Sequence, residues 1–300
     1  MLRVGTRRST LALVQARSIV ELLEAAGSSA VLVPIATGGD AGAGPATRLD
    51  TGPAGRKGSF VREIVTALVG GHVDLAVHSA KDLPAEDPEG VVTAAVPERA
   101  DPLDVLVTRE AVLAEGAVLG TSSLRRRNQV LRWRPDLRVV DLRGNVDTRL
   151  RRLNDGDVDG LLLAAAGLAR LGLSPEHARP MTIAQMVPAP GQGALAIQVR
   201  RDDDATTEIV RSLDHSSSRE AFDAERAVVR ALGADCALPL GAYAVVGSDG
   251  VRLRASVIDD EGAAADAEVT AGGAAPAAEA AVAALLAAGA GPMLDAAREA

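Results

Sequence analysis

The sequence predicts an α/β protein built from two similar halves and a smaller α+β domain at the C-terminus. Strand-like and helix-like segments alternate over the first hundred residues, and the same alternation begins again near residue 104. Near the end, strand-like segments at 241–247 and 251–258 flank a Ser-Asp-Gly turn, which is typical of a β-hairpin. A chain of 300 residues has room for two or three domains of about 100–150 residues each.

The first half is expected to open with a strand, a helix and a second strand. The helix begins at Thr10, with Ser9 or Thr10 as its N-cap, and ends at Ala26, with Gly27 as the stop. The segment 38–58 is rich in Gly, Ala and Pro and is too long for an ordinary connection, so it predicts a functional lid or partial disorder. The other elements predicted here are strands at 2–5, 31–37 and 73–79 and a helix at 60–69.

The second half repeats this order before the chain reaches its C-terminal part. Residues 194–200 have the pattern of a return strand, the segment from Ser218 to Gly233 is strongly helical, and the Ala-rich end predicts two helices. The other elements predicted here are strands at 104–108, 117–123 and 137–143, helices at 123–134 and 146–156, and a strand running into a helix at 158–166.

The composition excludes several classes of protein. Hydrophobic residues make up 47% of the chain and charged residues 24%, a balance that is typical of a globular protein and not of a disordered one. Aromatic residues make up only 1%, which argues against a stacking platform for single-stranded nucleic acid. The single cysteine excludes an intrachain disulfide and a cysteine-rich metal cluster, and the four histidines lack metal-ligand spacing, so we expect no metal site.

The same features favour a reduced, cytoplasmic setting. The start of the chain turns polar after Val4, so we expect no signal peptide. The longest late uncharged stretch, 280–294, is shorter than the roughly 20 residues that span a bilayer, so we expect no membrane segment.

Charge is distributed unevenly along the chain. The net charge is −8, yet the segment 125–152 contains ten arginines against three aspartates, which leaves +7 there and −15 elsewhere. A local cationic block in an acidic protein suggests an anionic ligand. Nucleic acid remains possible on charge alone, although no helix-turn-helix or zinc-finger spacing is present.

Two segments combine a strand end, hydroxyl side chains, a helix start and arginines. The first is GTRRST, with Arg7, Arg8 and Ser9, and the second is GTSSLRRR at 120–127. Helix N-termini attract anions, but Ser9 also serves as an ordinary N-cap beside solvated arginines. Because the arrangement occurs once in each α/β half, it suggests two anion sites at the carboxyl ends of strands.

The segment LRGNVDTRLRR adds Arg143, Asn145 and Arg149 at a strand end and a helix start. The alternative is an exposed basic helix face, which we expect for Arg151 and Arg152. Guanidinium groups bind carboxylates through paired N–H donors, so a ligand rich in carboxylates suits the first three residues.

The segment VHSAKDLP places Ser79, Lys81 and Asp82 just after a strand. A carboxylate beside an ammonium group stays ionised and can stabilise a developing cation, although the same residues also suit a solvated turn. Cys236 lies between a predicted helix and the hairpin, where its thiol is accessible, whereas a lone cysteine elsewhere is more often a small buried apolar residue.

Together these segments resemble the porphobilinogen deaminase (hydroxymethylbilane synthase) family. The resemblance covers nearly the whole chain in the family's order, through TRRSTLALVQA, KGSFVREI, DLAVHSAKDLP, GTSSLRRR, LRGNVDTRL, AAAGLARLGL, PAPGQGALAI and DCALPLGAYA. It implies two domains like type II periplasmic binding proteins and a smaller α+β C-terminal domain. It also implies a transferase that joins four porphobilinogen molecules head to tail, with release of ammonia, to give hydroxymethylbilane for tetrapyrrole and haem-type porphyrin synthesis.

The resemblance also implies roles for particular residues. Asp82 corresponds to the catalytic carboxylate, Cys236 to the thioether attachment of a dipyrromethane cofactor, and Lys57 and Phe60 to the end of the active-site loop. The implied cofactor and substrate contacts are Arg7, Ser9, Ser79, Lys81, Thr121, Ser123, Arg125, Arg126, Arg143, Gly144, Asn145, Arg149 and Arg170.

The implied domains are residues 1–96 with 195–214, residues 97–194, and residues 215–300. We expect a cytoplasmic monomer that takes porphobilinogen and has no nucleic-acid or membrane partner. One rival hypothesis is a non-catalytic anion-binding protein of the periplasmic-binding-protein type, and a second is a nucleic-acid binder that uses the arginine block.

Overall fold

The computed structural model describes residues 1–36, 59–234 and 238–299. The predicted lid segment, 38–58, lies outside the described residues, as do Lys57 and Cys236. The chain divides into two units, which are described separately. The first unit contains Met1–Arg99 and Ala194–Arg219, and the second contains Ala100–Gly193 and Glu220–Ala300.

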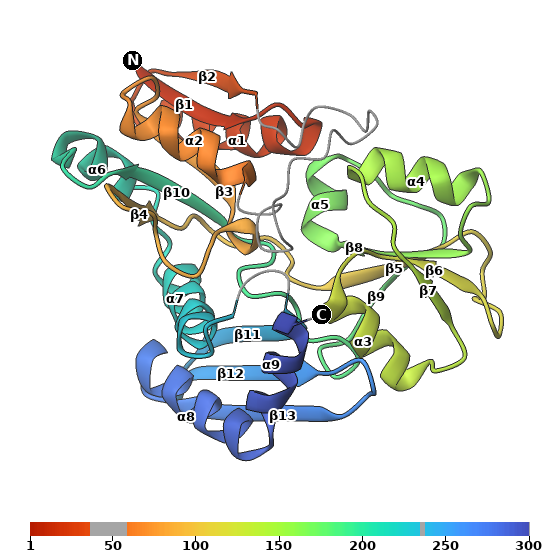
Figure 1. The fold of residues 1–300 in the computed structure, drawn as a ribbon. Coiled ribbons are helices and arrows are strands. Elements are labelled where there is room, and N and C mark those ends of the chain that lie inside the picture. The colour runs from red at the N-terminus through yellow and green to blue at the C-terminus, as the bar shows by residue number, and fades with distance from the viewer. Residues whose placement is uncertain (37–58, 235–237, 300) are drawn as a thin grey trace. The chain divides into compact units, whose positions relative to one another are not determined.

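The first unit is built around a five-stranded sheet with the order β2-β1-β3-β10-β4 (Figure 1). Strands β1, β2 and β3 are parallel, and β10 runs antiparallel to both of its neighbours. The carboxyl ends of the three parallel strands therefore share one edge with the start of β10, where Leu195 pairs with Ser79. The strands are β1 Leu2–Arg7, β2 Ala30–Ile35, β3 Leu75–Ser79, β4 Val91–Ala95 and β10 Leu195–Arg200.

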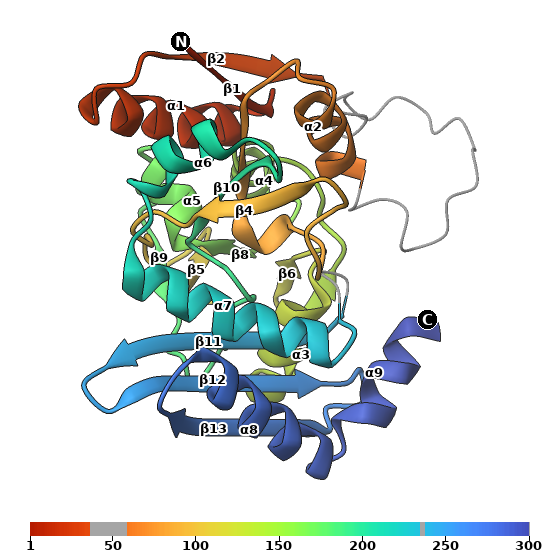
Figure 2. The ribbon, with the colours of Figure 1, turned by 90° about the vertical axis from the view of Figure 1, so that its left-hand side faces the viewer.

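Helices cover both faces of this sheet, as Figure 2 shows for α1 and α2. Apolar residues of α1 (Thr10–Ala25) and α6 (Asp204–Arg211) pack on the face that carries Val77 and Ile197. Helix α2 (Ser59–Val69) packs Ile64 and Leu68 against Ala76 on the other face. Helix α7 (Ser216–Ala231) crosses the boundary between the two units.

The second unit contains a five-stranded sheet of the same design, with the order β7-β6-β8-β5-β9. Strands β6, β7 and β8 are parallel, and β5 runs antiparallel between β8 and β9. Helices α4 and α5 cover one face, and α3 covers the other. The elements are β5 Asp104–Thr108, β6 Val118–Gly120, α3 Leu124–Trp133, β7 Arg138–Val140, α4 Val146–Asn154, β8 Gly160–Ala164, α5 Ala165–Arg170 and β9 Ala178–Pro180.

The second unit also contains a three-stranded antiparallel sheet, β11-β12-β13, with helices against it. The predicted hairpin is present, and its turn is closed where Gly247 pairs with Gly250. Strand β13 was not predicted, because its residues, AADAEVTA, are mostly alanine and other residues of low strand propensity, although Asp266, Glu268 and Thr270 are exposed and the residues between them are not. The elements are β11 Leu240–Gly247, β12 Gly250–Ile258, β13 Ala264–Ala271, α8 Ala274–Ala287 and α9 Ala290–Glu299.

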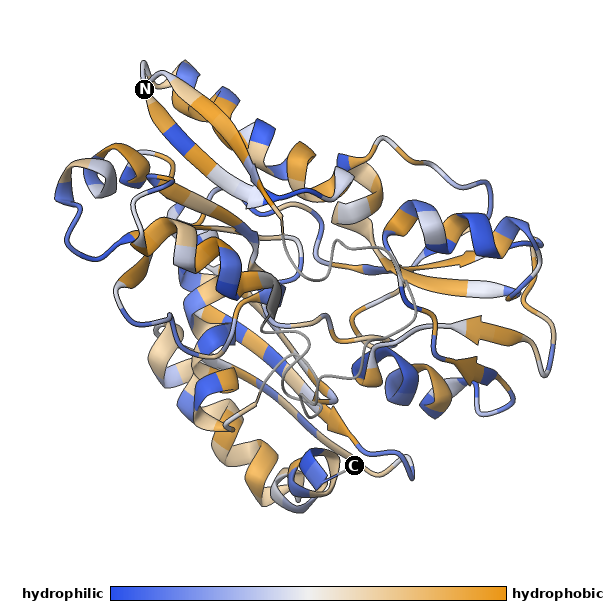
Figure 3. Ribbon diagram, turned by 45° about the horizontal axis from the view of Figure 1, so that its top comes forward, coloured by the Kyte–Doolittle hydropathy of each residue, from blue (hydrophilic) through white to orange (hydrophobic). Residues whose placement is uncertain are grey.

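The predicted α/β class, with two similar halves and a smaller C-terminal α+β part, is confirmed. Figure 3 shows hydrophobic residues along most strands and a mixture of hydrophobic and hydrophilic residues on the helices. Within the described part of the chain, no single helix is long and apolar enough to cross a membrane. The pair α8 and α9, bent by 81°, reaches that length and composition only when the two helices are counted together.

Candidate functional site

The predicted site residues of the first unit lie at the edge where its parallel strands end. Arg7 is the last residue of β1, and Ser79 is the last residue of β3. Ser9 caps α1 because its Oγ accepts a hydrogen bond from the Ala12 N–H at 3.4 Å. Ser9 is therefore the N-cap of α1, as one of the two interpretations of this segment predicted. Both Arg7 and Ser9 are half-buried.

A short 3₁₀ turn, Ala80–Asp82, carries the predicted catalytic carboxylate. The Ala80 N–H donates to the Ala194 carbonyl at 3.1 Å, and the Leu83 N–H closes the turn by donating to the Ala80 carbonyl at 3.3 Å. Ala80 is completely buried, whereas Asp82 is exposed and Lys81 is half-buried. The buried alanine thus anchors the turn, and Asp82 projects into solvent, where a ligand can approach it.

Strand β3 also carries a buried histidine, one residue before Ser79. His78 is 5% exposed, and burial lowers the pKa of its imidazole to about 4, although the nearby Asp87 carboxylate opposes the shift. Asp87 in turn accepts hydrogen bonds from Thr93 and from the Gln198 amide. The imidazole of His78 is therefore buried and neutral near pH 7.

In the second unit, the first cluster of predicted residues lies where β6 ends and α3 begins. The Thr121 N–H donates to the Val140 carbonyl at 3.0 Å, and the Thr121 hydroxyl accepts from the Ser123 N–H at 3.2 Å. Ser123 caps α3, since its Oγ accepts from the Arg126 N–H at 3.4 Å. The two hydroxyls therefore shape the start of the helix that carries Arg125 and Arg126.

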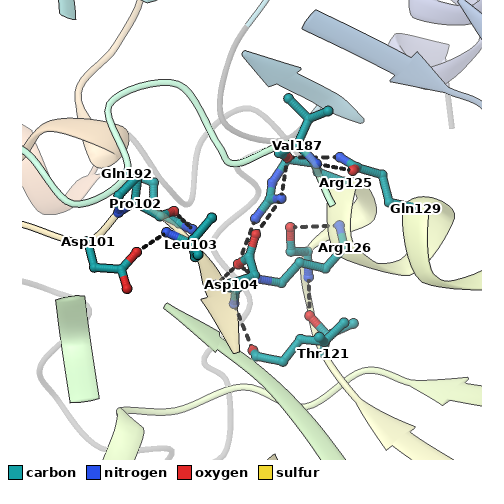
Figure 4. A network of polar contacts seen from close by, with 12 residues as sticks. Asp101, Pro102, Leu103, Asp104, Thr121, Arg125, Arg126, Gln129, Val187 and Gln192 are labelled. Atoms are coloured by element: carbon teal, nitrogen blue, oxygen red, sulfur yellow. Dashed lines mark hydrogen bonds and ion pairs between the residues drawn. The ribbon is translucent and has the colours of Figure 1, made fainter. Parts of the chain in front are cut away.

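Arg125 and Arg126 bind an acidic residue that sequence analysis missed (Figure 4). Asp104, the first residue of β5, is fully buried, and its carboxylate accepts hydrogen bonds from both guanidinium groups at 2.8–3.1 Å. Arg125 also donates to the Val187 carbonyl, and Arg126 donates to the Leu162 carbonyl. Both arginines are at most 6% exposed. The only signal in the sequence was an aspartate at the start of the apolar strand DVLVT.

The second cluster lies where β7 ends and α4 begins. Gly144 has φ +120°, a conformation that L side chains rarely adopt, and an added Cβ would lie 3.1 Å from the Thr148 side chain. Its carbonyl accepts a hydrogen bond from Arg149 Nε at 2.8 Å. Asn145 is the N-cap residue of α4, and its exposed side chain makes no capping hydrogen bond. Arg143 is exposed and forms an ion pair with Asp141 at 2.9 Å.

Arg149 and Arg170 differ from the other arginines of this edge. Both are half-buried, and within the described part of the chain their side chains bond only backbone carbonyls, of Gly144 and Gly193 respectively. Burial lowers the pKa of Arg170. Burial, followed by the positive charge of Arg126, lowers the pKa of Arg149 to about 10, with Asp141 opposing the shift. Both guanidiniums remain charged near pH 7, and an anion would relieve this unfavourable burial.

These donors fit a ligand that carries several carboxylates. A guanidinium binds a carboxylate through two parallel N–H donors, and the second unit carries such half-buried groups on α4 and α5, in Arg149 and Arg170. The elements that carry these arginines follow β6, β7 and β8, which are parallel and therefore end on the same side of the sheet. Phe60 is a residue of α2, and its side chain is outside the described part.

Two mixed sheets of one design, each with polar residues at the carboxyl ends of its parallel strands, define an α/β protein with candidate ligand-binding residues at these edges. Residues 2–208 match the family model described as "Porphobilinogen deaminase, dipyromethane cofactor binding domain", and residues 220–288 match "Porphobilinogen deaminase, C-terminal domain". The chain belongs to the porphobilinogen deaminase family.

Similar proteins agree with this assignment. The porphobilinogen deaminase of Rubrobacter xylanophilus is 48% identical over 267 residues, which cover 87% of this chain and 85% of that protein. The porphobilinogen deaminase of Thermus thermophilus is 46% identical over 266 residues, which cover 86% and 85%. Two solved structures share weaker similarity. A periplasmic substrate-binding protein from Coxiella burnetii is 17% identical with a TM-score of 0.45, over 75% of this chain and 97% of that one. A nutrient binding protein from Burkholderia cenocepacia is 15% identical with a TM-score of 0.43, over 71% and 91%.

The predicted family, the transferase class and the dipyrromethane cofactor are confirmed by these matches. The non-catalytic alternative is not favoured, since both family models describe porphobilinogen deaminase domains.

Proposed function

We propose that this chain condenses four porphobilinogen molecules head to tail into hydroxymethylbilane and releases ammonia at each addition. The observation that carries the proposal is the pair Arg149 and Arg170, two half-buried guanidiniums without an acidic partner in the described part. Each pyrrole of the substrate carries an acetate and a propionate group, which match such donors. The family match supplies the reaction class.

In this proposal the arginines bind and orient the ligand. Arg149 and Arg170 offer planar guanidinium groups with paired N–H donors to carboxylates. Arg143 offers a third such group when a ligand carboxylate replaces Asp141 as its ion-pair partner. Arg125 and Arg126 are buried and contribute positive charge near Arg149 instead of binding the ligand directly. The remaining contacts proposed in the second unit are Thr121, Ser123, Gly144 and Asn145, and those in the first unit are Arg7, Ser9, Ser79 and Lys81.

Asp82 is proposed as the catalytic carboxylate. Loss of ammonia from the aminomethyl group of porphobilinogen leaves positive charge on the substrate, and a carboxylate beside it lowers that barrier electrostatically. The 3₁₀ turn anchored by Ala80 holds Asp82 in an exposed position where a substrate can reach it.

Cys236 is proposed as the attachment point of the dipyrromethane. It is the only cysteine of the chain, and it falls in the sequence between the end of α7 and the start of β11. When bound, the dipyrromethane supplies the pyrrole carbon that accepts the first substrate, so that each addition is intramolecular. Lys57 and Phe60 are proposed to belong to the end of an active-site loop.

Intact-mass measurement of the purified protein tests this proposal. We expect a mass that exceeds that of the sequence by two pyrrole units, and we expect Cys236→Ser to lose both this increment and the activity. An unmodified protein with full activity would contradict the assignment of Cys236.

We further propose three domains, with residues 1–96 and 195–214, 97–194 and 215–300, in a cytoplasmic monomer without nucleic-acid or membrane partners. Light scattering tests the oligomeric state. Steep salt dependence of binding to a DNA duplex would instead support the nucleic-acid hypothesis.

A further inference from the structure

We propose that Asp104 is a positioning residue of the cationic site: its carboxylate fixes Arg125 and Arg126 and so sets the surroundings of Arg149. The inference rests on the proposed function, since it assumes that this edge binds the pyrrole carboxylates.

The geometry around Asp104 is a closed network (Figure 4). Its Oδ1 accepts from Arg126 Nε at 2.8 Å and from Arg125 Nη2 at 3.1 Å, and its Oδ2 accepts from Arg125 Nη1 at 2.8 Å. The two guanidiniums also donate to the Val187 carbonyl at 2.7 Å and to the Leu162 carbonyl at 2.9 Å. The carboxylate thus joins the first turn of α3 to β5, and the two arginines join it to β8 and to the segment that follows β9.

The backbone of Asp104 lies at the strand end that precedes α5. Asp104 pairs with Ala164, the last residue of β8, and the neighbouring Leu103 carbonyl accepts from the Ala165 N–H at 3.0 Å. Helix α5 begins at Ala165 and ends at Arg170. A displacement of β5 at this point would therefore reach both the α3 arginines and the helix that carries Arg170.

Asp104 also sets the local charge. The two guanidiniums and the single carboxylate are all buried, which leaves one positive charge in excess. Burial lowers the pKa of Arg126, and Arg125 adds to this shift, whereas Asp104 opposes it. The charge of Arg126 also contributes to the lowered pKa of Arg149. A neutral residue at position 104 would raise the buried excess from one charge to two and leave two guanidiniums without an acid.

The test compares Asp104→Glu and Asp104→Asn with a matched control, Asp159→Asn. Asp159 bonds Arg109 at 3.0 Å and the Val118 N–H at 2.9 Å at the opposite edge of the same sheet, so its loss also removes an arginine partner. The measurements are urea unfolding, intact mass, kcat and KM for porphobilinogen, and the rise in Tm caused by sulfate.

Asp104→Glu keeps the charge but moves the carboxylate by one methylene, so we expect a folded protein whose kcat/KM falls about 100-fold. We also expect a smaller fraction to carry two pyrrole units and a smaller sulfate-induced rise in Tm. Asp104→Asn is expected to lose more urea stability and to make KM depend more steeply on ionic strength. Asp159→Asn is expected to lose stability while keeping the wild-type mass, KM and sulfate response.

A folded Asp104→Glu with wild-type kcat/KM and sulfate response would overturn the role of Asp104, as would an equal functional loss in Asp159→Asn. The sulfate measurement keeps the two proposals apart, because it does not need the reaction. A wild-type protein without added mass or turnover would overturn the proposed function. If its sulfate response still fell in Asp104→Glu, the positioning role would stand.

Discussion

The two five-stranded sheets share one strand order but use their carboxyl-end edges differently. In the first unit, an exposed carboxylate, Asp82, projects from a turn anchored by a buried alanine, and the buried histidine of β3 is neutral. In the second unit, arginines fill the edge, and the deepest two share one buried carboxylate. The difference shows that one backbone design supports either an accessible charge or a buried cationic cluster, depending on the side chains placed at its strand ends.

Exposure explains why the two edges need different internal support. Asp82 is exposed to solvent, and its turn is held by backbone hydrogen bonds. Arg125 and Arg126 are removed from water, and a buried guanidinium without an acid is strongly unfavourable. The following five predictions test this contrast, beginning with the largest expected effect.

Asp82→Asn is expected to lower kcat on the order of 10²–10³-fold, because it removes the charge that stabilises the developing cation. Its effect on the free energy of unfolding should stay within about 0.5 kcal/mol, since the side chain is exposed. Turnover assays and urea unfolding measure the two effects. Glu89→Gln, at another exposed acid of the first unit, is the control, and wild-type turnover in Asp82→Asn would show that Asp82 is only a turn residue.

Acidification is expected to destabilise the first unit through His78. Its pKa is about 4 when folded and 6.5 in the reference state, so between these values the unfolded chain binds more protons. This contribution is complete above pH 6.5 and is lost as pH falls towards 4, by on the order of 3 kcal/mol. In the second unit, a hydrogen bond from Arg134 lowers the pKa of Asp136 to about 2. The stability that this carboxylate contributes is therefore retained between pH 6.5 and 4.

Urea unfolding between pH 4.5 and 7.5 measures this effect. His78→Gln should flatten the dependence of the unfolding free energy on pH, whereas His72→Gln, at an exposed position, should leave it unchanged. An equally steep dependence in His78→Gln would assign the titration to other groups.

Arg149→Lys keeps the positive charge but removes the planar fork, so we expect KM to rise about 10–100-fold, as a lost charged hydrogen bond of about 1.5–3 kcal/mol implies. Arg143→Lys should act in the same direction with a smaller effect, because Arg143 is exposed. Mass spectrometry should show truncated enzyme-bound oligomers. Arg152→Lys, on the same helix but paired with Asp157, is the control. An equal change in KM in all three variants would mean that these arginines act only through their summed positive charge and not through specific contacts.

Gly144→Ala is expected to cost about 1–2 kcal/mol of unfolding free energy, because alanine must adopt a positive φ there. It should also raise KM, since the added Cβ presses on Thr148 and shifts the carbonyl that holds Arg149. Gly172→Ala is the control: it has φ +64° but open space around its Cβ. A similar rise in KM in both variants would show that Gly144 has no specific role in the binding site.

Asp141→Ser is expected to have the smallest effect. It releases Arg143 from an exposed ion pair, and such pairs contribute about 0.2–1 kcal/mol, which corresponds to a decrease in KM of at most about fivefold. The gain should disappear at high salt, and a higher KM would mean that Asp141 orients Arg143 instead of competing for it.

The sequence by itself determined most elements of both α/β halves, because their periodicity and end signals are local. Strand β5 has the predicted bounds, Gly27 stops α1 with φ +85°, and the predicted anion-site residues cluster at strand ends as expected. Strand β13 was missed because alanine has a low strand propensity, although polar and apolar residues alternate along it, and its pairing with β12 is what makes it a strand.

Only the tertiary structure decided how the arginines differ from one another. Asp104 lies 21 and 22 residues from Arg125 and Arg126, and no local pattern links an aspartate at a strand start to a distant helix. The same holds for the half-buried setting of Arg149 and Arg170, whose side chains bond backbone carbonyls within the described residues, and for the neutral state of His78. Burial and partner choice depend on which segments pack together, and those properties set the charge and the geometry of each side chain.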